Sequence, residues 1–185
     1  MVRGSTNYMD SRCASITITH MDIGYYQFEK KGLKMYTNIN LCSKCDGKCC
    51  HTMPGSVYPQ QLKGNMKNNI IKLLLKGYTF DSWEGDPRSN KDEYSEVFFL
   101  RPAQRGHLGK ILHRSWGGLA CIFLSNTGCA LSEDSRPLGC QLLEPGESEC
   151  ISHAKGKNDK HAAAMAWLKY QKLIKNIINR GSNGE

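Results

Sequence analysis

Residues 41–50 read LCSKCDGKCC, which places four of the nine cysteines of the chain in the order C-x2-C-x3-C-C. These four are Cys42, Cys45, Cys49 and Cys50. Two cysteines that flank two residues on a tight turn can direct both sulfurs at one ion, and zinc sites and iron–sulfur clusters both use this spacing. Gly47 supplies the permissive backbone that such a turn needs. The stretch predicts a thiolate metal site around which the rest of the chain is arranged.

A second, looser set of cysteines begins 71 residues after Cys50, with 7, 10 and 9 residues between its members. We predict that both sets converge on a common inorganic centre, while Cys13 is left over. The predicted metal ligands are Cys42, Cys45, Cys49, Cys50, Cys121, Cys129, Cys140 and Cys150. Neighbouring side chains diverge, so Cys49 and Cys50 either serve two sites, or one of them ligates and the other is a free thiol.

The identity of the metal is left open by the spacing. Eight thiolates suit two closed zinc sites, or one four-iron (4Fe-4S) cluster with four spare thiols. His51 follows Cys50 directly and is an alternative ligand in place of one thiolate. The predicted cofactor is therefore zinc or an iron–sulfur cluster.

Cysteine usage predicts a reducing compartment. The cysteine count is odd, so disulfide pairing alone would leave one thiol over. The first 20 residues have no apolar core of a signal peptide, and the longest apolar run, residues 70–75, is too short to span a bilayer. We therefore expect a cytoplasmic protein with no membrane partner, in which clustered thiols bind metal. A disulfide-bonded exported protein is the alternative.

The chain has 25 basic and 17 acidic side chains, giving a formal net charge of +8. Cations near a thiolate site lower the thiol pKa, so we interpret part of the surplus as compensation by Lys44, Lys48 and Arg136. Four other basic residues are spread too thinly to form a dense run, which argues against specific nucleic-acid binding. They are Arg101, Arg105, Lys110 and Arg114.

Length and patterning predict one small, irregular, helix-rich α+β domain over residues 14–180, with loose ends at 1–13 and 181–185. Apolar periodicity predicts one helix that follows Pro59 and stops at Gly77, and a second from Asn158 to Gly181. Strands are expected over residues 15–19, 94–100 and 119–124. Long loops need something to hold them, and a cysteine-bound metal centre would tie them together.

Several short motifs occur in a fixed order along residues 40–175. They are CSKCDGKCC (42–50), MPG (53–55), YP (58–59), FDSWEGD (80–86), LRP (100–102), WGGLACIFL (116–124), TGCAL (127–131), RPLGC (136–140), LEP (143–145) and Cys150. Through this combination the chain resembles the YkgJ-type cysteine-cluster proteins, the CxxCxxCC group described as a zinc- or iron-chelating domain. Gln141 stands where an arginine is expected in that family, so no cation is expected at that position.

The resemblance implies bound zinc or an iron–sulfur cluster but no particular reaction, so whether the protein is an enzyme stays open. A related cysteine cluster occurs in flagellin lysine N-methylases, which makes methyl transfer to a protein side chain one alternative. A zinc-stapled module that binds a protein or a nucleic acid is the other. The sequence has no H-E-x-x-H, Walker, G-x-S-x-G or G-x-G-x-x-G motif. The acids around Trp83, namely Asp81, Glu84 and Asp86, are interpreted as a solvated loop. Protein partner, substrate and oligomeric state stay undetermined.

Overall fold

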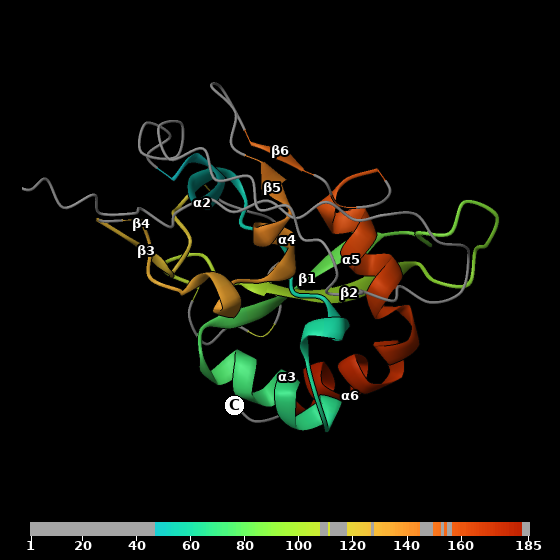
Figure 1. Ribbon diagram of the computed structural model, residues 1–185. Coiled ribbons are helices and arrows are strands. Elements are labelled where there is room, and N and C mark those ends of the chain that lie inside the picture. Colours follow the sequence, from blue (N-terminus) through green and yellow to red (C-terminus); the bar gives the residue numbers. More distant parts are fainter. Residues whose placement is uncertain are drawn as a thin grey trace, which may run out of the picture.

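Two antiparallel strands, β1 (Tyr78–Glu84) and β2 (Glu96–Pro102), form the centre of the molecule (Figure 1). The computed structural model describes residues 47–107, 111, 118–126, 128–144, 150–152, 154 and 157–182. The expected strand at residues 15–19 lies outside these residues. The described part of the chain has an α+β fold, as predicted, with more residues in helices than in strands.

The central ribbon is fixed by a continuous buried run. In β2, the five residues from Val97 to Arg101 are buried, and β1 pairs with them in a register that sets Phe80 opposite Leu100. Val57 bridges Leu100 on the free edge of β2. The strand predicted at residues 94–100 is confirmed as β2, shifted two residues along the chain. β1 was not predicted as a strand, because its acidic residues suggested a loop.

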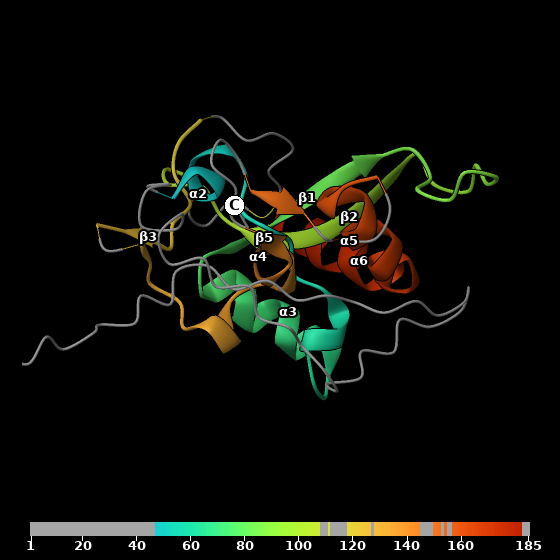
Figure 2. The same ribbon diagram turned by 45° about the horizontal axis from the view of Figure 1, so that its top comes forward.

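Helices α3 (Met66–Leu75) and α6 (Gln171–Ser182) lie on one side of the ribbon, opposite α2 (Lys48–Thr52) (Figures 1 and 2). The predicted helix after Pro59 is interrupted. A 3-10 turn, η1 (Pro59–Gln61), comes first, and Gly64 then adopts a φ of 83°. The Asn65 side chain accepts a hydrogen bond from the Asn68 backbone N–H and caps α3. The predicted stop at Gly77, with a φ of 95°, is confirmed.

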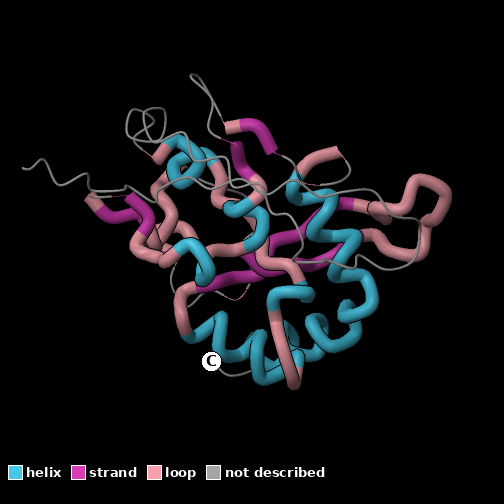
Figure 3. The backbone as a smooth tube through the Cα atoms, in the orientation of Figure 1, coloured by secondary structure: helices cyan, strands magenta, loops and turns pink. Residues whose placement is uncertain are grey.

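The second predicted helix begins where expected but is not straight. The Asn158 side chain accepts from the His161 N–H and caps α5 (Asp159–Trp167). A 3-10 segment, η3 (Leu168–Tyr170), follows and turns the chain into α6, as the tube in Figure 3 shows. The apolar stripe points inward as predicted, because Ala163, Trp167 and Ile174 are fully buried.

Short elements complete the side that carries α2. They are β3 (Leu124–Ser125), β4 (Gly128–Cys129), η2 (Glu133–Ser135), α4 (Leu138–Gln141), β5 (Leu143–Glu144) and β6 (Ile151–Ser152). The strand predicted over residues 119–124 is wrong for most of its length. Leu119 is exposed, Cys121 forms one bridge with Gln104, and a turn leads into β3. Among the described residues, no helix is long and apolar enough to cross a bilayer.

Candidate metal centre

Three segments that are distant in sequence meet on the α2 side of the ribbon. The Cys121 N–H donates to the Cys50 carbonyl at 2.7 Å, which joins α2 to the chain before β3. The Gly139 N–H donates to the Ser56 carbonyl at 2.9 Å, which joins the segment after α2 to α4. The backbone thus brings the tight cysteine cluster and the downstream cysteines together.

The sulfur atoms follow the backbone. The Cys50 thiol is hydrogen-bonded to the thiols of Cys121 and Cys49. The Cys121 contact is the main cause that raises the pKa of Cys50 to about 12, with burial and the nearby Cys129 adding to it. Neighbouring Cys49 and Cys50 therefore do not diverge completely, since both sulfurs lie within reach of each other.

Cys140 approaches the same cluster from α4. Its thiol donates to the Gly55 carbonyl at 3.6 Å. Burial raises the pKa of Cys140 well above its usual value, and the Cys49 and Cys50 thiols raise it further. The close approach requires glycine, because a Cβ on Gly55 would overlap the backbone of Gly139 and Cys140.

Tyr78, the first residue of β1, lies near the cysteine cluster. Burial is the main cause that raises the pKa of the Tyr78 hydroxyl, and the thiols of Cys140, Cys121 and Cys129 raise it further. Three cysteines from separate short elements therefore lie within electrostatic range of one side chain.

The remaining predicted ligands are placed less closely or not at all. Cys150 is described and half-buried just before β6, whereas Cys42, Cys45 and the leftover Cys13 lie outside the described residues. His51 is exposed on α2. The six described cysteines are free thiols rather than disulfides. Within the described ranges, no three His, Cys, Asp or Glu side chains are grouped closely enough to hold a metal ion.

The donor chemistry fits a soft cation, because sulfur atoms gathered from α2, from the segment before β3 and from α4 are the ligands that zinc and iron–sulfur clusters take. The described sulfurs form only part of the predicted set of eight. A complete set of ligands therefore depends on Cys42 and Cys45, of which the structure gives no placement.

A buried ion pair stands next to the cluster, and it corrects one prediction. Asp81 is fully buried in β1 rather than in a solvated loop, and its Oδ2 lies 2.8 Å from Arg101 Nε and 3.3 Å from Lys160 Nζ. Burial lowers the pKa of Arg101, whereas Asp81 and the nearby Cys121 raise it. Arg101 is therefore a buried cation beside a cysteine, although its place in the sequence groups it with scattered basic residues.

Of the three cations predicted to assist the thiols, Lys48 and Arg136 belong to the described residues. Lys48 is exposed on α2, and Lys44 is outside the described residues. Arg136 is buried, and its Nε donates to the Leu131 carbonyl at 3.2 Å. Distance along the sequence did not predict which cations lie near the cysteines, because Arg101 is 20 residues from Cys121 in the chain yet close in space.

Asp159 is a second residue that the sequence did not reveal. Its Oδ2 accepts hydrogen bonds from the Ser56 N–H at 2.8 Å and the Ser56 hydroxyl at 2.7 Å, and its Oδ1 accepts from the Tyr58 hydroxyl at 3.1 Å. It thereby anchors the segment after α2 to the start of α5. Its position just after the Asn158 cap was the available signal, but an acidic residue in the first turn of a helix usually needs no further explanation.

Comparisons with models of known families, with curated proteins and with solved structures give no match. The resemblance to the YkgJ-type proteins therefore stays a prediction that rests on the motifs alone.

Proposed function

We propose that this protein binds zinc or an iron–sulfur cluster through its two sets of cysteines. One observation carries the proposal: the Cys121 N–H donates to the Cys50 carbonyl at 2.7 Å, which brings the two sets of cysteines together although 71 residues separate Cys50 from Cys121. Five described cysteines from separate segments lie in one region, and thiols gathered in this way are the usual ligands of zinc and of iron–sulfur clusters.

In this proposal, Cys49, Cys50, Cys121, Cys129 and Cys140 belong to the centre, and Cys42, Cys45 and Cys150 complete it. A bound metal would supply the cross-link that holds the irregular loops on the α2 side. The chain contributes the close backbone approach at Gly55 and the buried charge of Arg101 beside Cys121. Methyl transfer and the interaction module remain alternatives that rest on the family resemblance.

The test is purification without oxygen, followed by a visible spectrum and metal analysis of one sample. A colourless protein with about two zinc ions per chain supports zinc, and a brown protein with iron and sulfide supports a cluster. Cys50→Ser should lose most of the metal, because it removes a ligand from the centre of the group. Cys13→Ser is the matched control and should keep it. Preparations without metal in wild type, or full metal content in the Cys50 variant, would contradict the proposal.

A further inference from the structure

Two segments of the chain carry basic residues without any acidic residue, and both belong to the helices on one side of the ribbon. Residues 59–77 and 162–182 together contain eight lysine or arginine residues and no acidic residue. Removing these eight from the 25 basic residues leaves 17, which equals the number of acidic residues. The charges of the remaining residues sum to zero, although residues 97–132 also contain four basic and no acidic residues and are offset by acidic stretches elsewhere.

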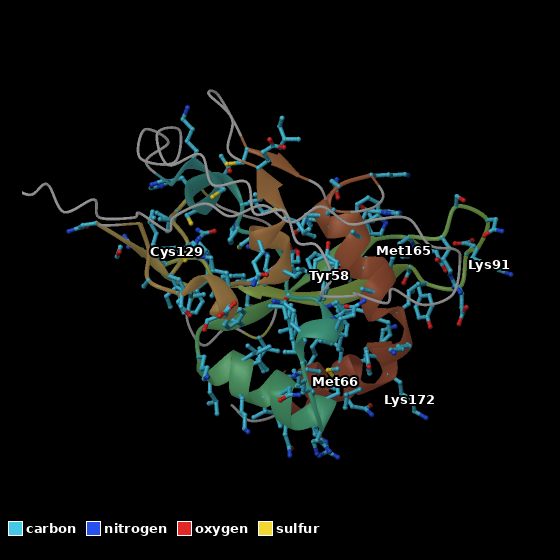
Figure 4. The ribbon with its side chains drawn as sticks, viewed as in Figure 1. Tyr58, Met66, Lys91, Cys129, Met165 and Lys172 are labelled. Atoms are coloured by element: carbon cyan, nitrogen blue, oxygen red, sulfur yellow. The ribbon has the colours of Figure 1, made fainter. Side chains whose placement is uncertain are left out.

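These eight side chains are all exposed: Lys63, Lys67, Lys72, Lys76, Lys169, Lys172, Lys175 and Arg180. Figure 4 shows nitrogen-tipped side chains that extend from α3, and Lys172 from α6, on the side away from the ribbon. The described cysteines lie across the ribbon on the α2 side. Compensation of thiolate charge, which we expected to account for part of the surplus, does not explain charge on the opposite side of the molecule.

Two aliphatic side chains interrupt this basic surface. Leu75 is 83% exposed and Ile71 is 39% exposed, four residues apart on α3. Residues at this spacing lie on the same face of a helix. Lys72 and Lys76 follow each of them directly in the sequence. Exposed aliphatic side chains next to lysines on one helix are typical of amphipathic surfaces that bind at a membrane interface.

We propose that the surface formed by α3 and α6, which we call the α3–α6 face, docks on an anionic phospholipid bilayer. Lysines of an amphipathic surface attract anionic headgroups, and each strengthens binding about fivefold. Leu75 and Ile71 enter the headgroup region, as apolar residues of interfacial helices do. In this proposal the protein lies on the membrane surface, contrary to our expectation of no membrane partner, and none of the described helices is long and apolar enough to span it.

A nucleic acid is the competing polyanion, and the composition of the face disfavours it. Seven of the eight cations are lysines, and the exposed residues of α3 are lysine, asparagine, isoleucine and leucine. Base readout relies on arginine, and single strands stack on aromatic rings. An aliphatic pair gains nothing against phosphates, whereas it gains from the interior of a bilayer.

The test is co-sedimentation of the full-length, metal-loaded protein with vesicles. We expect binding to phosphatidylcholine mixed with phosphatidylglycerol, none to pure phosphatidylcholine, and release at about 0.5 M salt, where charges are screened beyond about 4 Å. Lys72→Glu/Lys76→Glu should weaken binding at least about 25-fold. Leu75→Ser should weaken it about tenfold.

Matched controls distinguish an effect of the α3–α6 face from an effect of net charge or of any exposed apolar residue. Lys91→Glu/Lys157→Glu changes the charge equally at exposed lysines outside both segments, and Ile151→Ser removes an exposed aliphatic residue on β6. Both should bind as wild type does. Absence of vesicle binding at low salt, or equal loss in the control pair, overturns the proposal. Binding to duplex DNA that Leu75→Ser leaves intact, without vesicle binding, assigns the face to nucleic acid instead.

Discussion

At the scale of single residues, Arg101 belongs both to the buried core and to the surroundings of the candidate metal centre. It is fully buried, its Nε lies 2.8 Å from Asp81 Oδ2, and Cys121 is among the groups that raise its pKa against the effect of burial. Removing Arg101 is costly, because the buried Asp81 would keep only Lys160, at 3.3 Å, as a compensating charge. Arg101 should therefore affect both stability and metal retention.

Arg101→Met is expected to lower the free energy of unfolding by about 3–5 kcal/mol, because Asp81 stays buried. The double variant Arg101→Met/Asp81→Leu should recover most of that loss, since it removes both charges. Metal retention should stay about tenfold weaker in both variants, because each lacks the cation beside Cys121. Denaturant unfolding and a chelator titration measure the two effects. Full metal retention in the double variant would show that Arg101 acts only through its ion pair.

At the scale of elements, the sequence predicted those parts whose pattern is local. The helices over α3 and α5–α6 follow from apolar periodicity, and the caps at Asn158 and Gly77 follow from residue type. β1 was missed because Asp81 resembles a loop residue until Arg101 is placed beside it. The break before α3 was missed because Gly64 and Asn65 outweigh the apolar spacing of Leu62 and Met66. Long-range partners decide such cases.

The same limit applies to the candidate site. The cysteine spacing predicted that residues 42–50 and 121–150 meet, and the described contacts between Cys50 and Cys121 agree with it. Two buried charged residues near that meeting, Arg101 and Asp159, lie in ordinary sequence and were not predicted to be buried. No feature of the neighbouring sequence shows whether the Asp159 side chain is buried or exposed.

Asp159 connects Ser56 and Tyr58 to the start of α5, so a change in its ionisation should change the free energy of unfolding. Burial raises its pKa despite the hydrogen bonds from Ser56 and Tyr58. The folded protein therefore binds the proton more tightly than the unfolded chain, and the stability from this group rises as the pH falls through the folded pKa towards the unfolded value. The unfolding free energy of wild type minus that of Asp159→Asn should increase when the pH is lowered from 7 to 4.5.

Denaturant unfolding at both pH values measures this difference. Asp134→Asn, at an exposed carboxyl on η2, is the control and should show no such trend. Asp159→Ala should cost about 1–3 kcal/mol at either pH, because buried donors from Ser56 lose their acceptor. A difference between wild type and Asp159→Asn that is constant with pH would contradict the assignment.

At the scale of the whole molecule, two halves are held by different means. The hydrophobic core links β1, β2, α3, α5 and α6 through residues such as Phe80, Phe99 and Trp167. On the α2 side, the segments around Cys50, Cys121 and Cys129 are joined by few backbone hydrogen bonds, and α2 has no buried residue. Regions with few buried apolar contacts open at low cost unless a cross-link holds them.

Metal removal should therefore loosen one half and leave the other folded. After chelation, amide hydrogen exchange is expected to rise at least about tenfold in residues 47–56 and 119–130, because a bound metal contributes stability only where its ligands are. Exchange in β1, β2 and α6 should change less than about threefold, since their protection comes from the core. The same treatment of Cys13→Ser should give the same pattern. Loss of protection across the whole chain would mean that the metal holds the entire fold, and unchanged exchange near Cys50 would mean that the cysteines do not cross-link it.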